Sequence, residues 1–157
     1  MIHRVATSVA LLAIAFTANA ADSSTKAVAL NIEAFKTGFR NCSRPTPQGM
    51  TSFWQVSQPD LDTVDAALLL HLEKSGAAKK LRGSPSSYGR QYLGFNRGER
   101  RFIYINAFLR SSGDARSRYQ RWCDGGNQFW GIEYNVNDKT FTGFAVDSVY
   151  RDPLDGL

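Results

Sequence analysis

Arginine and lysine side chains are concentrated in one stretch of the chain, between residues 79 and 121. This stretch holds eleven cations and two acids, Glu99 and Asp114, whereas the rest of the chain after residue 20 is net acidic. Most of the cations are arginines, whose planar guanidinium groups bind carboxylates and phosphates through a rigid fork of N–H donors. The bias predicts a surface of positive potential that attracts an anionic partner.

The cations nearest to turns are the expected contact residues. A loop of about a dozen residues in a small domain is more often functional than filler. Tyr119 and Trp122 flank Arg121 at the end of such a loop, and aromatic residues mixed with arginine are typical of protein contact sites. The alternative is that Trp122 covers a disulfide and the arginines only keep the protein soluble. The expected binding residues are Arg97, Arg100 and Arg101 at a hairpin tip, Arg110, Arg116, Arg118 and Tyr119 in the loop Leu109 to Gln120, and Arg121 and Trp122 just after it, beside Cys123.

Carboxylates offer one route to catalysis. Two acids at the right separation cleave a glycosidic bond without histidine or metal, and the candidates are Glu99, Asp124, Glu133 and Asp147. Glu99 and Asp124 fall in turns. Glu133 is expected on one face of its strand and Trp130 on the other face of the same strand. Each is well explained as turn or surface chemistry, so we expect no catalytic residue.

The sequence offers few residues for catalysis by histidine or for binding a metal or cofactor. The only histidine after residue 20 is His71, which lies between Leu70 and Leu72 and is expected to be a packing residue on a helix. Two cysteines without CxxC spacing do not make a zinc site, and the aspartates between residues 60 and 65 lack the glycine and distal glutamate of a calcium loop. The common hydrolase and nucleotide-binding motifs are absent as well. We expect neither a metal nor a cofactor, and no enzyme activity.

The first twenty residues are typical of an export signal. His3 and Arg4 precede an apolar run from Val5 to Phe16, and Ala18-Asn19-Ala20 provides small residues where a signal peptidase cuts. The run is too short to span a membrane, which takes about twenty apolar residues. The sequence therefore predicts a signal peptide at 1–20 and a single mature domain at 21–157, periplasmic or secreted.

Export gives the two cysteines a structural meaning. In an oxidising compartment a single pair usually forms a disulfide, here Cys42 to Cys123. Closing a loop of about 80 residues stabilises the fold by up to about 4.5 kcal/mol in the chain-entropy treatment. That is a large share of the stability of a small domain.

Helical periodicity marks the first half of the mature chain. Apolar residues recur at three- to four-residue spacing over 26–40, with Ser24 or Thr25 as the cap, and this predicts a first helix. Leu61, Val64, Leu68 and Leu72 predict a second helix, with a cap at Ser57 and a stop at Gly76.

Alternating strands mark the second half. Residues 90–96 and 100–108 predict a hairpin that turns at Arg97-Gly98, followed by strands at 129–136 and 140–150. Both faces of 100–108 are apolar, which indicates a central strand. The expected fold is α+β, with two N-terminal helices packed on a four- to five-stranded antiparallel meander and one disulfide. This order resembles the cystatin and NTF2-like architectures in its elements alone, and a shared fold does not establish function.

Three functions are consistent with these features. The first is an exported, non-catalytic binding or inhibitor protein, of the immunity type, that contacts another envelope or secreted protein through its arginine and aromatic loop. The second is a binder of an anionic polymer such as nucleic acid, lipopolysaccharide or acidic glycan, whose affinity would fall steeply with salt. The third is a carboxylate-dependent glycan hydrolase.

Overall fold

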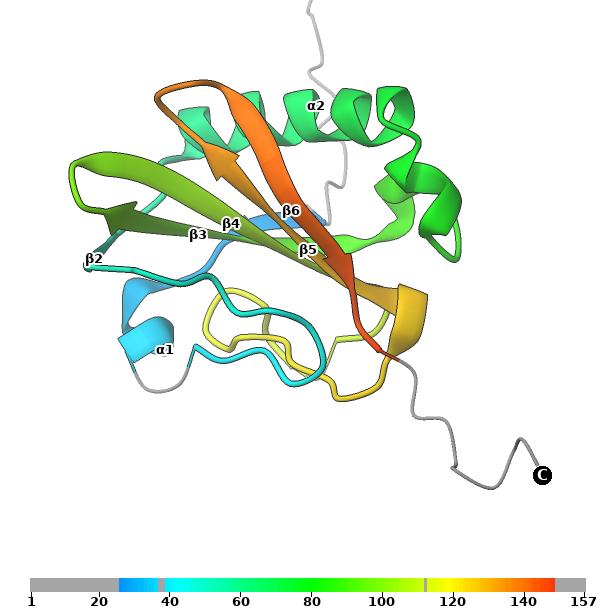
Figure 1. Ribbon diagram of the computed structural model, residues 1–157. Helices are drawn as coiled ribbons and strands as arrows, with labels where there is room; N and C mark the ends of the chain where they lie inside the picture. Colours follow the sequence, from blue (N-terminus) through cyan, green and yellow to red (C-terminus); the bar gives the residue numbers. More distant parts are fainter. Residues whose placement is uncertain (1–25, 37–38, 112, 149–157) are drawn as a thin grey trace, which may run out of the picture.

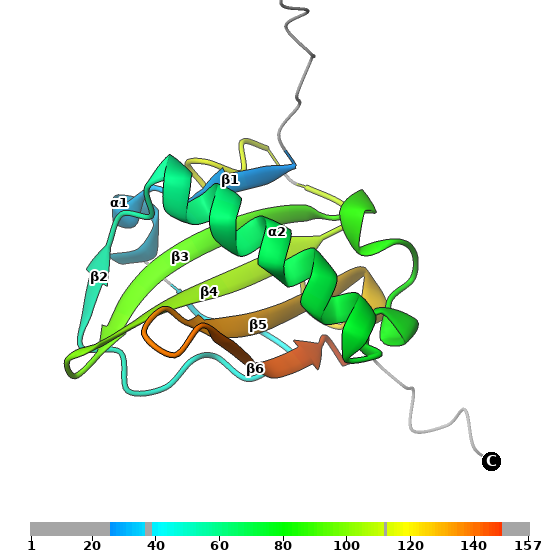
Figure 2. The same cartoon turned by 90° about the horizontal axis from the view of Figure 1, so that it is seen from above.

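The computed structural model describes residues 26–36, 39–111 and 113–148, which form an α+β fold (Figures 1 and 2). The long elements are α2 (Gln58–Lys74), β3 (Gly89–Arg97), β4 (Arg100–Phe108), β5 (Phe129–Asn135) and β6 (Thr140–Val146). The short ones are β1 (Ala27–Ala29), α1 (Ile32–Lys36), β2 (Ser52–Trp54) and the 3-10 turns η1 (Ala77–Lys80), η2 (Pro85–Ser87) and η3 (Gly126–Gln128). The strands form one six-stranded sheet in the order β1-β3-β4-β5-β6, with β2 also paired to β3.

One long helix covers one face of this sheet, and loops cover the other (Figure 1). Helix α2 confirms the predicted periodicity, because Leu61, Val64, Leu68 and Leu72 are all buried against the sheet. The Ser57 hydroxyl accepts a hydrogen bond from the Asp60 backbone N–H at 3.3 Å, as an N-cap does. The helix ends where Gly76 takes a left-handed conformation with φ 73°, as expected from the sequence.

The predicted hairpin is confirmed, and its second strand is central. Arg97 pairs with Arg100 across the turn, and Gly98 has φ 61°. Strand β4 lies between β3 and β5, with Ile103 and Ile105 in the core under α2 and with Tyr104 in the cluster on the opposite face. Strands β5 and β6 continue the antiparallel meander, although β6 ends at Val146, and residues 149–150 of the expected strand lie outside the described residues.

The predicted first helix over 26–40 is wrong over most of its length. Residues 27–29 form β1, which pairs in parallel with β3, and only Ile32–Lys36 is helical. Of the residues that suggested a helical stripe, Val28 is buried in the edge strand, whereas Ile32 begins the short helix. Pairing with β3 satisfies backbone groups that an isolated helix would have satisfied internally. The expected caps Ser24 and Thr25 lie outside the described residues.

This edge strand also changes the class of sheet. With β1 parallel to β3, the sheet is mixed rather than an antiparallel meander, and α2 is the one long helix of the described residues. The resemblance in element order to the cystatin and NTF2-like architectures is therefore not supported. The broader prediction of an α+β fold with one disulfide is confirmed.

Candidate functional site: the loop layer

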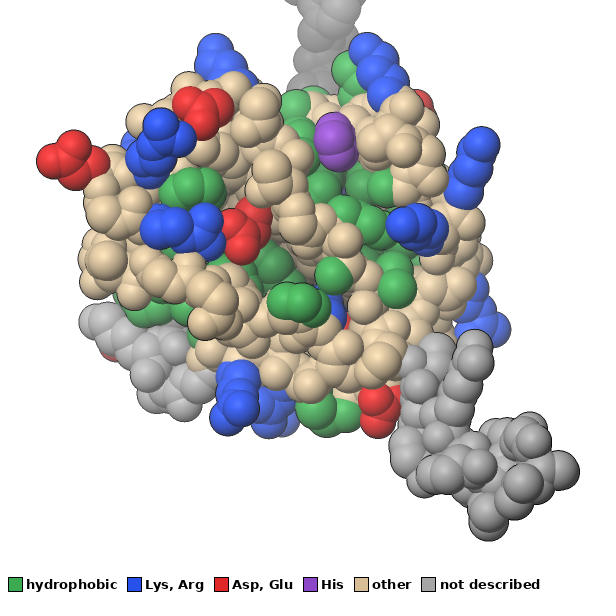
Figure 3. Space-filling model, in the orientation of Figure 1, with side chains coloured by type: hydrophobic (Ala, Val, Ile, Leu, Met, Phe, Trp, Pro, Cys, Tyr) green, Lys and Arg blue, Asp and Glu red, His purple; other side chains and the backbone are tan. Residues whose placement is uncertain are grey.

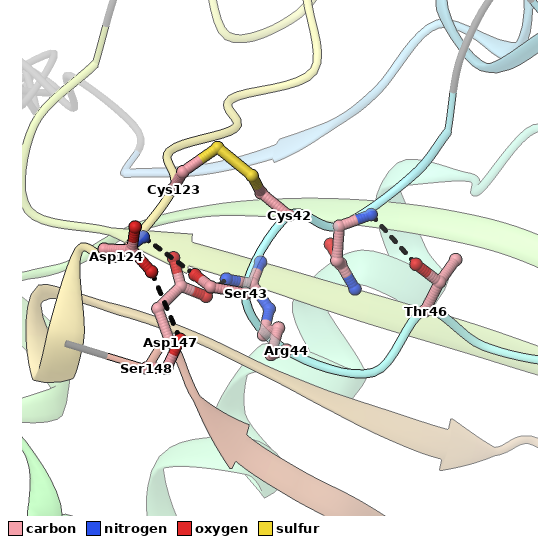
Figure 4. Close-up of a disulfide and its surroundings, with 9 residues drawn as sticks. Cys42, Ser43, Arg44, Thr46, Cys123, Asp124, Asp147 and Ser148 are labelled. Atoms are coloured by element: carbon pink, nitrogen blue, oxygen red, sulfur yellow. Dashed lines mark hydrogen bonds and ion pairs between the residues drawn. A yellow bond between two sulfur atoms is a disulfide. The ribbon is translucent and has the colours of Figure 1, made fainter. Parts of the chain in front are cut away.

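A disulfide joins the two long loops that lie on the face of the sheet opposite α2 (Figure 4). We call residues 39–50 and 109–125 together the loop layer. Cys42 and Cys123 are bonded with their Cα atoms 5.1 Å apart, which confirms the predicted pairing. Beside the bond, the Asp124 backbone N–H donates to the Ser43 hydroxyl at 2.9 Å. The disulfide thus holds the two loops side by side.

Two buried amide side chains hold the second loop against the sheet. The Gln91 Nε2 donates to the carbonyls of Ala115 and Arg118, at 2.6 and 2.7 Å, and its Oε1 accepts from the Gln120 backbone N–H at 2.9 Å. The Asn106 Nδ2 donates both to the Gln120 carbonyl and to Gln91 Oε1. Gln91 and Asn106 are both fully buried, so these hydrogen bonds are protected from water. Hydrogen bonds from the sheet therefore hold the backbone of the second loop in place.

A buried arginine holds the first loop in the same way. Arg44 donates to Tyr104 Oη at 2.9 Å, to Asn106 Oδ1 and to the Asp147 carboxylate. Its side chain is 4% exposed and that of Asp147 is 1% exposed. Burial lowers the pKa of Arg44, but Tyr104, Tyr119 and Asp147 more than offset this effect and raise the pKa above its ordinary value. Arg44 is therefore a charged residue whose almost fully buried side chain is taken up by contacts within the protein.

Tyrosine 119 faces into the loop layer. Its hydroxyl donates to Asn41 Oδ1 at 2.5 Å, and Asn41 Nδ2 donates in turn to Tyr104 Oη at 3.0 Å. The Tyr119 ring stands edge-on against Phe39, with centroids 5.2 Å apart. Its position is that of a connector between the two loops, although the sequence suggested a contact residue.

The arginines of the hairpin tip are engaged within the molecule. Arg97 forms an ion pair with Glu133 at 3.1 Å and lies 4.6 Å over the Phe102 ring. Arg101 lies 3.9 Å over the Trp54 ring. A third tip arginine, Arg100, pairs with Asp138 at 3.0 Å in an exposed position. Each of the three has a partner in another part of the chain, on β5, β2 or the turn after β5.

The arginines of the loop layer are placed differently. Arg110, Arg116, Arg118 and Arg121 are all exposed, and no ion pair with another described residue holds any of them. Trp122 is 39% exposed and contacts Phe129, with ring centroids 5.6 Å apart. On the lower edge of Figure 3, below the sheet, Lys and Arg side chains gather beside hydrophobic and acidic ones. The loop layer therefore presents exposed cations, without an ion pair among the described residues, next to an exposed indole.

The hairpin tip lies far from the second loop along β4, although it contacts the first loop, because Arg97 Nε donates to the Gln48 carbonyl at 2.9 Å. The nine residues of β4 separate the turn at one end from the start of the loop at the other, a span of about 27 Å at the usual rise per residue. The structure thus divides the expected arginines into a tip group that has ionic or ring partners and a loop group that forms no ion pair with another described residue.

One exposed cation of this surface was missed by the sequence analysis. Arg40 is exposed, precedes Asn41 and Cys42, and lines a hollow of about 590 Å³ formed by the first loop. The Tyr119–Asn41 hydrogen bond and the disulfide place its backbone beside residues 119–123. Its position two residues before Cys42, matching that of Arg121 before Cys123, was the signal that could have found it.

Three of the four candidate carboxylates contact other residues of the protein, and the fourth, Glu99, lies in the hairpin turn. Asp147 is buried against Arg44, and Glu133 pairs with Arg97. Asp124 accepts a hydrogen bond from the Ser148 hydroxyl at 3.3 Å, beside Asp147 (Figure 4), while Glu99 is exposed in the hairpin turn. The structure brings Asp124 and Asp147 together but leaves only the first of them open to solvent.

Comparison with known proteins gives no relative from which a function could be transferred. No protein-family model, curated protein or solved structure matches this chain. Within the described ranges, no helix has the length and apolar character needed to cross a bilayer. The predicted signal peptide at 1–20 lies outside the described residues, and the disulfide is compatible with the oxidising compartment that the signal implies.

Proposed function

We propose that this protein is an exported, non-catalytic binding or inhibitor protein that contacts another exported protein through the loop layer. The observation that carries the proposal is the contrast between a fixed loop backbone and the free cations that it displays. Arg118 and Arg121 are exposed without an ion pair among the described residues, whereas Gln91 anchors the backbone between them.

Such a surface is suited to tight contact for a physical reason. A loop that is already ordered loses little conformational entropy when it binds, so more of the contact energy appears as affinity. Arginine and tryptophan are the residues most enriched at the energetic centres of protein interfaces. Trp122, directly after Arg121, places an apolar group beside the charges.

A non-catalytic role is supported by how the carboxylates are placed. The acid with the most protected environment, Asp147, is neutralised by Arg44 and is closed to solvent. A glycan hydrolase needs two carboxyl groups that both reach the substrate. The described residues hold no such open pair next to the loop layer.

An anionic polymer is the second candidate, because exposed arginines also bind phosphate and sulfate groups. The exposed Trp122 favours a protein over a polyanion, because an indole offers an apolar contact that a chain of phosphate or sulfate groups does not use. The two candidates differ in salt dependence, since counterion release makes polyanion binding fall steeply as salt rises.

The proposal is tested by affinity capture with the disulfide-bonded protein immobilised. Envelope and secreted fractions of the source organism are applied in about 0.15 M salt. We expect one protein to be retained in near-stoichiometric amount by the native chain. The double variant Arg118→Glu/Arg121→Glu should lower its affinity about tenfold or more, because central interface arginines contribute on the order of a kilocalorie or more each.

The matched control is Lys79→Glu/Arg82→Glu, which changes net charge equally on exposed residues away from the loop layer. It should retain the partner as the native chain does, and both variants should melt close to the native temperature because they alter only exposed side chains. Equal loss by both variants, together with elution from heparin at unusually high salt, would favour the polyanion candidate. Full retention by the loop variant would refute the loop layer as the contact surface.

A further inference from the structure

A recess on the other side of the sheet lies between the C-terminal half of α2, η1 and the edge strand β6. It encloses about 310 Å³. Hydrophobic side chains gather there below a histidine in Figure 3. Its apolar lining comes from Ala77, Ile132, Phe141 and Phe144. The volume is at the small end of the range for ligand sites, about 300–1,000 Å³.

The rim of the recess is polar and carries positive charge. Lys80 and His71 line it together with the hydroxyl residues Ser75 and Thr142, and none of the described residues that line it is acidic. The His71 ring stacks on Phe141, with centroids 4.8 Å apart, so its polar edge is held at the boundary between apolar wall and rim. An exposed ammonium and an imidazole are donors that suit a carboxylate.

The edge strand is shaped at this point by a β-bulge. The β5–β6 register shifts between Gly131 and Glu133, and Gly143 takes φ 67°. A bulge leaves the backbone groups of the extra residue outside the ladder and redirects the next side chain. The Phe144 ring accordingly lies 5.8 Å from that of Trp130, and Gly143 contributes backbone to the wall of the recess.

We propose that this recess binds a small carboxylate with an apolar tail, of the size of a medium-chain fatty acid. The tail lies against Ile132, Phe141 and Phe144, and the carboxylate lies at the rim and accepts from Lys80. The pairing of an apolar floor with a cationic rim selects for this amphipathic chemistry, since a long-chain alcohol offers Lys80 no negative charge and a short acid leaves the floor uncovered. The proposal is independent of the proposed function, because the recess is on the α2 side of the sheet and the loop layer is on the opposite side.

The test is a titration of the isotope-labelled, disulfide-bonded protein with octanoate, followed by NMR. We expect saturable shifts confined to signals of residues 71–80 and 141–144. Octanol and acetate serve as probes that each lack one half of the ligand, and both should bind at least about tenfold more weakly than octanoate. Shifts that do not saturate, or that centre elsewhere in the chain, would overturn the proposal.

Two neighbouring lysines give a matched pair of variants. Lys80 lines the recess, whereas Lys79 is exposed and does not line it. Lys80→Ala should weaken octanoate binding about tenfold and leave octanol binding unchanged, because the lost interaction is a charge-assisted hydrogen bond. Lys79→Ala and Arg118→Glu/Arg121→Glu should leave octanoate binding as it is. Equal affinity for octanoate in the Lys79 and Lys80 variants would show that the rim does not recognise the carboxylate.

Discussion

Buried phenol groups lie both in the core under α2 and in the loop layer. Tyr88 and Tyr92 are fully buried under α2, and Tyr119 joins the two loops. Burial is the largest cause of a raised pKa for each of these three side chains and for Tyr134, and the rise is greatest for Tyr92 and Tyr119. Their ionised forms are therefore disfavoured in the folded state.

This burial predicts a loss of stability in alkali. In the unfolded chain a tyrosine ionises near pH 10, and in the folded chain these tyrosines ionise only at higher pH. Because their folded pKa values are raised, the stability they contribute is fully present below about pH 10 and is lost as the pH rises above it. Urea unfolding midpoints between pH 8 and pH 11.5, together with phenolate absorbance, measure this. A midpoint that stays constant while all the tyrosines ionise near pH 10 would show that the phenols are open to solvent.

Arginine shows why a residue type does not reveal its role. Arg44 is a buried pin, Arg101 covers Trp54, and Arg118 is exposed without an ion pair among the described residues. The sequence shows only that cations are concentrated between residues 79 and 121, and Arg44 lies outside that stretch. Which arginine is free depends on the acids and rings that the fold brings to it, and these partners are distant in sequence.

At the scale of elements, the central strands serve both faces of the sheet. Residues of β3 and β4 alternate between the α2 core and the loop face, and on the loop face they place Gln91 and Asn106 under the second loop. The loop therefore depends on strand side chains for its backbone hydrogen bonds.

Replacing one of these amides should loosen the loop. Gln91→Leu removes the donor to the Ala115 carbonyl, one of the two donors to the Arg118 carbonyl, and the acceptor of the Gln120 backbone N–H, at a cost of about 1–3 kcal/mol. We expect a lower urea midpoint, faster hydrogen exchange at Gln120 and weaker capture of the partner. The control is Gln58→Leu, which removes an exposed amide at the start of α2. A Gln91 variant with native exchange at Gln120 would contradict the anchoring role.

Local signals explain which elements the sequence predicts. The β3–β4 hairpin and α2 follow from turn residues, periodicity and caps that lie within one segment. Strand β1 was missed because Val28 stands four residues before Ile32, a spacing that also fits a helix, and only the pairing with the edge of β3 decides between the two. The loop layer was missed as a layer because Gln91 and Tyr119 read as ordinary strand and loop residues until their partners are known.

At the scale of the whole molecule, the sheet separates two surfaces. The loop layer covers one face, where the disulfide and Arg44 hold it, and the recess opens on the side of α2 (Figures 1 and 3). The sequence predicted the covalent link and the region of the free cations. It did not predict that the hairpin tip is engaged internally, because Glu133, Asp138 and Trp54 come from three separate parts of the chain.

The most direct test of the loop layer is a hydrogen-exchange footprint of the disulfide-bonded protein with and without its captured partner. Binding should slow exchange in residues 39–50 and 109–125 and leave α2 and the hairpin turn at 97–100 unchanged. Protection of α2 or of the hairpin turn, with the loop layer exchanging as it does in the free protein, would show that the loop layer is not the contact surface.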